Sequence, residues 1–400
     1  MKNKKLTLKE IDNFKKIFKQ MVISNEPETI ISAVGMAEGL DDERLYDIML
    51  DGIRIEKKSN RLLPSDFFMD NGPRGIPKEW GTYNTSYPYN AMKKIINNGF
   101  HPYRFTAMTG ILNAASKYPK WQAFVNEIKE LRSPCFYLDF LNCFKNLDIL
   151  YLENGDRFEK GIDMPCLKKI FWYSFGHGEC PYDETGISLH AINKCHNLTH
   201  LEIEGNLFLH DGFEGIDEMR NLETLIVEKL QGNFLSGFSP LGSCKKISIL
   251  SINKKTEYPR TKYDTFHNHS STIMNSPNYQ VSGESNYAHR WVDPPNVIYD
   301  ELYPPVNISN LKGLENLYEL KVLILKGFHS LTDTTALTNC KNLEEIHILS
   351  NSVANLVFHK KLPQLRKLKL KCKELKTIAC QEYPDMLEEF IIESNKFNFS

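Results

Sequence analysis

The segment Cys340-Lys-Asn-Leu343-Glu-Glu-Ile346-His-Ile348-Leu-Ser-Asn351 decides how this chain of 400 residues folds. Its apolar residues follow the spacing L-x-x-L-x-L, in which Ile, Val or an aromatic residue can replace Leu. The fourth and sixth positions are two residues apart, so on a short strand both side chains point to the same side. A single copy of this spacing would not predict a fold, and the prediction rests on its repetition along the chain.

The spacing recurs nine times along the chain. The leading positions of the copies are Leu147, Leu167, Leu198, Leu222, Ile247, Leu320, Leu343, Leu365 and Leu387. The steps between them are 20, 31, 24, 25, 73, 23, 22 and 22 residues. Without the 73-residue step their mean is about 24, inside the range of about 20 to 29 residues that leucine-rich repeats use.

One such repeat cannot bury its apolar side alone. Stacked repeats bury a continuous ladder of side chains and pair each strand with its neighbours in a parallel sheet. We therefore expect an α/β solenoid with a curved parallel sheet on its concave face and an N-terminal α-helical cap. Over about residues 136–400 the chain resembles the leucine-rich-repeat superfamily, in particular the irregular cytoplasmic repeats of bacterial proteins. The resemblance implies a protein-interaction scaffold without catalysis, whose ligand differs between members.

Helices are expected ahead of the repeats. Thr7-Leu-Lys-Glu10 has the spacing of a capping box, and further helices are expected to begin near Pro27 and after Asp42. Residues 56–90 read as an irregular connection, followed by helical stretches at about 91–98 and 104–131 and a first strand near Phe136-Tyr-Leu138. We therefore divide the chain into an α-helical N-terminal region, residues 1–135, and a solenoid, residues 136–400.

The 73-residue step has two interpretations, two degenerate repeats or one insertion. No Leu occurs between Leu250 and Leu302, so the ladder residue is missing and we predict an insertion at about 254–307. Loops of this length are uncommon and are usually functional or disordered. His267, His269 and His289 in the insertion could supply three imidazoles to zinc, although their spacing fits no standard zinc motif. An enzyme or metal-dependent activity built on this insertion is therefore the alternative function.

Composition excludes several classes of protein. A formal net charge of -1 gives no bulk attraction to nucleic acid or to an anionic membrane. The first 20 residues lack the apolar core of a secretory signal, and no stretch approaches a membrane span. Nine cysteines without CxxC spacing suit a reducing compartment, so we expect a cytoplasmic protein. Cys195, Cys244 and Cys340 each precede a leading position by three residues and are expected to face the interior.

No motif for catalysis or cofactor binding is present. The sequence has no Walker-type loop, no G-x-G-x-x-G and no H-E-x-x-H, so we expect no enzymatic activity, no cofactor and no resident metal. The expected function is binding of another protein, of unknown identity, on the outward side of the strands.

Outward side chains lie two, four and six residues after each leading position. Along the solenoid they form an aromatic group, then an acidic group, then an apolar group and finally one of mixed charge. Aromatic residues left on an exposed sheet are of the type enriched in binding hot spots, unless the insertion or the N-terminal region covers them. The candidate partner-binding residues are Tyr151, Phe171, Tyr173, Glu202, Glu204, Glu228, Ile324, Lys326, His347 and Lys369.

The basic strand Arg366-Lys367-Leu-Lys369-Leu-Lys371 invites a nucleic-acid hypothesis. In the repeat register, however, Lys367 lies between Glu345 and Glu389, and opposite charges across strands stabilise a sheet by about 0.2 to 1 kcal/mol per pair. The lysines are thus explained without phosphate, which argues against nucleic acid.

The last repeat has little sequence after it to cover its apolar layer, which includes Phe390 and Ile392. Either Phe397 and Phe399 cover this layer or a second subunit does, so self-association through the C-terminal repeat is a further expectation.

Overall fold

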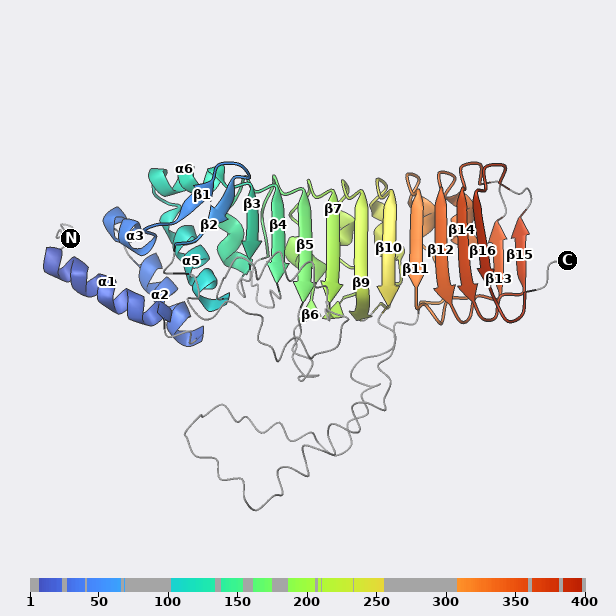
Figure 1. The fold of residues 1–400 in the computed structure, drawn as a ribbon, viewed down its shortest axis with the longest axis horizontal. Helices are drawn as coiled ribbons and strands as arrows, with labels where there is room; N and C mark the ends of the chain where they lie inside the picture. The colour runs from blue at the N-terminus through green and yellow to red at the C-terminus, as the bar shows by residue number, and fades with distance from the viewer. Residues whose placement is uncertain are drawn as a thin grey trace, which may run out of the picture.

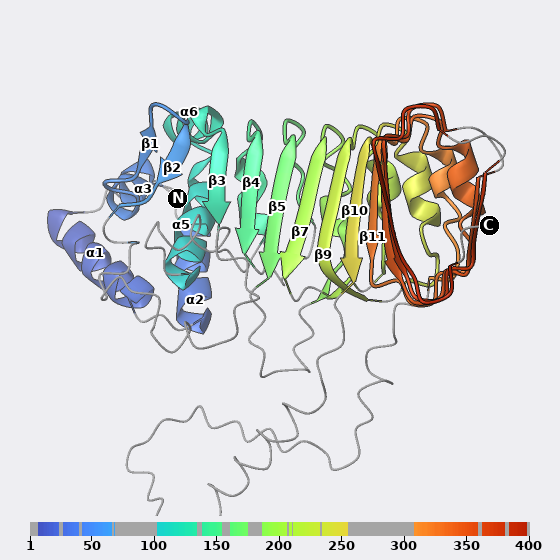
Figure 2. The same ribbon diagram turned by 45° about the vertical axis from the view of Figure 1, so that its right-hand side comes forward.

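The chain forms an elongated row of parallel strands with a helical unit at its N-terminal end (Figures 1 and 2). The computed structural model describes residues 7–23, 27–39, 42–65, 68, 102–133, 138–153, 161–174, 186–205, 208–209, 211–232, 234–254, 308–358, 362–380 and 384–397. The main sheet has the order β1-β2-β3-β4-β5-β7-β9-β10-β11-β12-β14-β16. Sequence neighbours are therefore spatial neighbours, as a solenoid requires.

All nine sequence repeats form strands of this sheet, and each strand begins two residues after its leading position. They are β4 (Ile149–Glu153), β5 (Lys169–Ser174), β7 (His200–Gly205), β9 (Thr224–Gly232), β10 (Ile249–Lys254), β11 (Val322–Lys326), β12 (Glu345–Ser350), β14 (Lys367–Cys372) and β16 (Glu389–Glu393). Neighbouring members pair in parallel and in the register that the repeats predict. The leucine-rich-repeat architecture is confirmed.

The inward side chains form one continuous core. Leu150, Leu201, Leu225 and Leu323, each at the fourth motif position, have an exposed fraction of 0%. Burial of a leucine side chain stabilises a fold by about 1.5 to 3 kcal/mol. Because the repeats before the last one each contribute two buried residues to the same core, the stack is stabilised only as a whole.

Asparagine side chains join four of the repeats to the segment of chain that precedes them. Asn197 Nδ2 donates a hydrogen bond to the carbonyl of Pro165 at 2.7 Å, and Asn342 Nδ2 does the same to the carbonyl of Tyr318 at 2.7 Å. Asn146 and Asn221 make equivalent bonds. These four residues directly precede a leading Leu, a regularity that is visible in the sequence but that we did not predict.

Cysteine thiols inside the core also link successive repeats. Cys195, Cys244 and Cys340 are buried, and Cys340 Sγ donates to the carbonyl of Leu314, in the preceding repeat, at 3.2 Å. Cys195 and Cys244 contact the carbonyls of Ile162 and Ile216 in the same way. Burial raises the pKa of the Cys340 thiol to about 12, so it stays protonated and able to donate. The prediction that these three cysteines face the interior is confirmed.

The return segments behind the sheet change with repeat length. Longer repeats return through the 3-10 helices η3 (Leu189–Ile192), η4 (Ile216–Glu218), η5 (Ser239–Ser243), η7 (Leu314–Asn316) and η8 (Thr335–Asn339). The 22-residue repeats near the C-terminal end use the strands β13 (Asn355–Phe358) and β15 (Thr377–Cys380), which pair in parallel. A strand covers about 3.3 Å per residue and a 3-10 helix about 2 Å, so fewer residues suffice for the return.

Shorter elements complete the solenoid. The 3-10 helix η2 (Leu138–Cys143) precedes β4, and β6 (Gly186–Ile187) pairs with β8 (Phe208–Leu209), which also pairs with β9.

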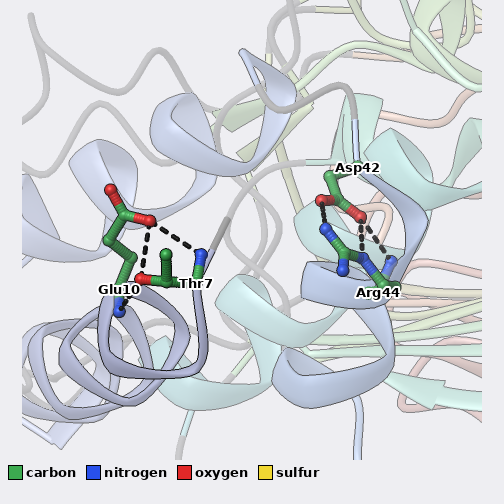
Figure 3. A network of polar contacts seen from close by, with 4 residues as sticks. All are labelled: Thr7, Glu10, Asp42 and Arg44. Carbon is green, nitrogen blue, oxygen red and sulfur yellow. Dashed lines mark hydrogen bonds and ion pairs between the residues drawn. The ribbon is translucent and has the colours of Figure 1, made fainter. Parts of the chain in front are cut away.

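The N-terminal unit contains the helices α1 (Leu8–Ile23), α2 (Pro27–Glu38), α3 (Glu43–Met49), α5 (Pro102–Ala115) and α6 (Pro119–Glu127). The Thr7–Glu10 capping box is present: the Thr7 amide donates to Glu10 Oε2 at 2.7 Å and the Glu10 amide donates to Thr7 Oγ1 at 3.3 Å (Figure 3). Asp42 caps α3 by accepting from the Arg44 amide and also contacts the Arg44 side chain (Figure 3). The three predicted helix starts are confirmed.

Two predictions for the region that joins helices to repeats are wrong. The helix expected at 104–131 is two helices, α5 and α6, because Pro119 starts a new helix and lacks the amide hydrogen needed to continue the first. The strand that pairs with β4 lies earlier than expected, as β3 (Glu130–Ser133), and Leu138 begins η2, while Phe136 and Tyr137 lie outside the described residues. The helix expected at 91–98 lies outside the described residues.

The sheet continues beyond β3 into the N-terminal region. β1 (Arg54–Glu56) and β2 (Arg61–Leu63) form an antiparallel pair, and β2 joins β3 in parallel. Residues 61–63 are therefore a strand, although the connection 56–90 was expected to be irregular. Strand pairing thus extends past residue 136, and the division of the chain into two domains there stays a prediction.

The 73-residue step leaves no gap in the sheet. β10 pairs directly with β11, from Ile249 opposite Val322 to Asn253 opposite Lys326. No repeat strand lies between them in the main sheet. Residues 255–307, including the three histidines, lie outside the described part of the chain. None of the described helices combines the length and apolarity needed to cross a membrane.

The last strand, β16, exposes part of its inward row. Phe390 is 42% exposed, whereas Leu368 at the same motif position in β14 is 4% exposed. Phe397 packs against the core, and Phe399 lies outside the described residues. Self-association at this edge stays a prediction.

Gly313 provides a test of how tightly successive repeats approach each other. It has a φ of +106°, and a Cβ at this position would collide with the carbonyl oxygen of Phe238 in the preceding repeat. We expect Gly313→Ala to lower the free energy of unfolding by about 2 kcal/mol or more. Urea denaturation followed by circular dichroism measures this change.

Gly237 is the matched control, since its φ is +57° but no atom lies within 4 Å of the Cβ that alanine would add. Gly237→Ala is expected to cost only the backbone strain of about 1 kcal/mol. Equal losses in the two variants would contradict a close approach at Gly313.

Candidate protein-binding face

The outward side of strands β3 to β16, here called the strand face, carries side chains in straight rows. Register pairs give its middle row in order as Arg132, Tyr151, Phe171, Glu202, Ile226, Ser251, Ile324, His347, Lys369 and Ile391. No described helix lies over β4 to β10 on this side, and the 3-10 helices lie behind the sheet (Figures 1 and 2). The N-terminal helices stack at the end of the row of strands and leave this face open.

The N-terminal end of the strand face carries a ladder of planar groups in contact with one another. The rings of Tyr151 and Phe171 stack with centroids 4.8 Å apart and an angle of 12° between their planes. The His200 ring lies next to Phe171, with centroids 5.0 Å apart and the two planes tilted by 43°, and the Arg132 guanidinium lies 5.2 Å from the centre of the Tyr151 ring. Arg132, Tyr151, Phe171 and His200, here called the ladder, thus connect four neighbouring strands.

The predicted aromatic group is therefore brought together in part. Tyr151 and Phe171 stack as neighbours, while the backbone of Tyr173 lies opposite Glu153 and Glu204 and its side chain lies outside the described part of the chain. Arg132 and His200 were not predicted as members. The strand of Arg132 could have been recognised from Ile128 and Leu131, which have the spacing of the first and fourth motif positions. Both side chains are buried, as the corresponding residues of the repeats are.

Burial alters the chemistry of the ladder tyrosine. The pKa of the Tyr151 hydroxyl is raised, first by burial and then by the nearby Glu130 carboxylate. Arg132 forms an ion pair with Glu130 at 2.8 Å, which holds its guanidinium beside the Tyr151 ring. The phenol therefore stays neutral at physiological pH and acts as a donor and an apolar surface.

Next to the ladder lie carboxylates that no described lysine or arginine neutralises. Glu202 Oε2 is 3.5 Å from His200 Nε2, and Glu228 accepts a hydrogen bond from Asn253 Nδ2 at 2.8 Å. Among the described residues, neither Glu202 nor Glu228 forms an ion pair with Lys or Arg. The row neighbours of Glu202 are Phe171 and Ile226, so the register brings it no cation.

The C-terminal end of the strand face is neutralised within itself. Lys367 pairs with Glu345 at 3.7 Å, and Lys367 lies between Glu345 and Glu389 in the sheet, as predicted. The other two ion pairs are Lys369–Glu389 at 3.1 Å and Lys371–Glu393 at 2.8 Å. Each of these lysines is thus paired with a glutamate of the same chain. This pairing explains the basic strand without a nucleic-acid ligand.

Ile324, Lys326 and His347 separate the two ends. Ile226 and Ile324 are half-buried and give the centre of the face an apolar floor. Lys326 makes no ion pair within the described residues. The pKa of His347 is lowered by burial first and then by the charges of Lys326 and Lys369, against which Glu345 acts in the opposite direction. The His347 Nε2 atom is buried without a hydrogen-bond partner among the described residues.

The described residues hold no cluster of three His, Cys, Asp or Glu side chains that could bind a metal ion. His267, His269 and His289 lie outside this part of the chain, so the metal hypothesis for them stays untested.

Comparisons with known proteins give similarity of fold. No model of a known protein family matches the chain, and no curated protein matches it in sequence. Among solved structures, an internalin C2 from Listeria monocytogenes is 13% identical with a TM-score of 0.36, and the match covers 72% of this chain and 92% of that one. An internalin (inlF) from the same organism is 11% identical with a TM-score of 0.33, over 73% and 83% of the two chains.

A leucine-rich-repeat protein from Leptospira interrogans is 14% identical with a TM-score of 0.24, over 70% of this chain and 88% of that one. These similarities concern the repeat fold.

His347 makes stability depend on pH in a definite direction. Because its pKa in the folded protein lies below the ordinary value of 6.5, the unfolded chain binds more protons as the pH falls. The stability gained from neutral His347 is complete above pH 6.5 and is lost as the pH falls through the folded pKa. We expect the unfolding free energy to fall from about pH 7.5 to about pH 5 less steeply in His347→Gln than in the wild type. Urea titrations at both pH values measure the slopes, and identical slopes would contradict a lowered pKa.

Proposed function

We propose that this protein is a non-enzymatic recognition module that binds another protein on its strand face. The observation that carries the proposal is the stacked, half-exposed pair of Tyr151 and Phe171 on a face that no described element covers. Stacked aromatic groups present a large apolar area at little entropic cost, which is why such residues dominate protein–protein contacts.

The shape of the face favours a polypeptide over a small molecule. Nine repeat strands about 4.8 Å apart span about 40 Å, far more than the enclosed pockets that hold small ligands. The face also combines an aromatic end, an apolar centre and a charged end, as protein interfaces do. An extended segment of a partner can contact all three.

The contact residues divide by role. Tyr151, Phe171 and Ile324 supply apolar area, and the charged residues around them set the orientation of the partner. The full set that we propose is Tyr151, Phe171, Tyr173, Glu202, Glu204, Glu228, Ile324, Lys326, His347 and Lys369.

We also infer a cytoplasmic setting. Cys143, Cys195, Cys244, Cys340 and Cys372 are buried free thiols, the state that a reducing compartment preserves. The alternative function, catalysis or metal binding by the insertion, rests on residues outside the described part of the chain, and no observation on the described residues favours it.

Capture from a lysate of the native cells tests the proposal. Replacing Tyr151, Phe171 and Tyr173 together by alanine removes the aromatic area, and we expect the full chain to lose most or all of its captured partner. Truncation of one interface hot spot costs about 2 kcal/mol or more, about thirtyfold in affinity. Quantitative mass spectrometry of the captured proteins measures the loss.

The matched control changes exposed apolar residues in the connections between strands. Leu235 is 91% exposed and Tyr318 is 55% exposed, so their replacement by alanine removes a similar kind of surface away from the strand face. This variant should capture the same proteins as the wild type. Unchanged capture by the triple variant, with wild-type circular dichroism, would refute the proposed site.

A further inference from the structure

The ladder already shows how this surface holds a guanidinium group. Arg132 lies against the Tyr151 ring, while its Nε and Nη2 atoms contact Glu130 Oε1 at 2.9 and 2.8 Å. A planar cation thus has an aromatic face on one side and a carboxylate at its edge. This combination suits arginine, whose guanidinium stacks on rings and forms bidentate hydrogen bonds.

The other end of the ladder offers the same groups, with no lysine or arginine paired to them in the part of the chain that the structure describes. Phe171 and His200 end the ladder, and Glu202 lies directly opposite Phe171 in the register, with its carboxylate 3.5 Å from His200. On β9, Ile226 is the neighbour of Glu202, and Glu228 lies two residues after Ile226. Two carboxylates therefore flank the half-buried Ile226 side chain beside an aromatic stack.

The rest of the strand face shows that this negative charge is exceptional. Every lysine of β14 has a glutamate partner on β12 or β16, so charges there cancel within the sheet. On β7 and β9 the neighbours of Glu202 are a ring and an aliphatic side chain. Among the described side chains, Lys169 lies beside His200 in another row. Charge complementarity therefore favours a cationic partner over β7 and β9.

We propose that the partner docks through a basic, arginine-bearing extended segment, whose guanidinium binds Glu202 and Glu228 at the β7–β9 end of the ladder. The aliphatic part of the arginine packs on Ile226, and its planar group lies beside His200 and Phe171. The proposal rests on the proposed function, since it specifies the chemistry of the protein that the strand face binds.

The experiment uses the full chain and a fluorescein-labelled nonapeptide of alternating Arg and Ser. Fluorescence anisotropy at about 150 mM salt measures its binding beside matched peptides of Glu and Ser and of Lys and Ser. We expect the Arg–Ser peptide to bind, the Lys–Ser peptide to bind several-fold more weakly because an ammonium does not stack, and the Glu–Ser peptide not to bind.

Two double variants separate a local contact from overall charge. Glu202→Gln with Glu228→Gln is expected to weaken Arg–Ser binding about tenfold, the effect of losing a charge-assisted hydrogen bond. Glu345→Gln with Glu389→Gln removes the same charge from β12 and β16 and should leave binding within about twofold. Circular dichroism and thermal unfolding confirm that both fold as the wild type.

Three outcomes overturn the proposal: equal weakening by both double variants, equal binding of the Arg–Ser and Lys–Ser peptides, or no preference for Arg–Ser over Glu–Ser. If the peptide experiment fails while capture still depends on Tyr151 and Phe171, the proposed function stands and the partner has a different chemistry. Loss of that dependence in the capture experiment would instead remove the proposed function itself.

Discussion

Each repeat buries its inward side chains only because another repeat lies against it, and this shared burial fixes the whole outer surface. A slip of one residue in any strand would turn buried residues such as Leu201 and Ile203 outward and expose the core. The amide of Asn197 and the thiol of Cys195, both bonded to carbonyls of the preceding repeat, oppose such a slip. The packing and hydrogen bonds of the inward side of the solenoid therefore determine the register of the sheet.

Because the inner rows are fixed, the outer rows are fixed as well. Residues two apart on one strand, and opposite residues on neighbouring strands, lie at spacings that the backbone sets rather than the side chains. This allows groups from strands far apart in sequence, such as Arg132 and His200, to belong to one ladder. The surface functions as a rigid template on which only the identity of the outward residues varies.

The two ends of the template use charge differently. At the C-terminal end, Lys369 pairs with Glu389 and stabilises the sheet itself. At the N-terminal end, Glu202 and Glu228 lie among rings and aliphatic groups, and their charge faces outward without a cationic partner among the described residues. A partner that supplies cations there gains electrostatic attraction without breaking an existing ion pair with Lys or Arg.

Much of this could be predicted from the sequence, and the exceptions have physical causes. The nine strands, the position of Lys367 between two glutamates and the buried cysteines follow from a fixed period. Arg132 was missed because Ser133 occupies the sixth motif position of its strand, so the apolar spacing is incomplete. His200 was not expected beside Phe171 because the register places Glu202, not His200, opposite Phe171 and pairs His200 with Lys169. Side-chain direction, which the period does not determine, brings His200 and Phe171 together.

Hydroxyl-radical footprinting of the isolated full chain tests most directly whether the strand face is open. Phe171 and Trp172 are adjacent in β5 but lie on opposite sides of the sheet: Phe171 is half-buried and Trp172 has an exposed fraction of 0%. The account predicts that Phe171 and Tyr151 are oxidised while Trp172 is protected, although an indole is at least as reactive as a phenyl ring. Protection of Phe171 and Tyr151 to the level of Trp172 would show that another part of the chain covers the face, and would contradict the account.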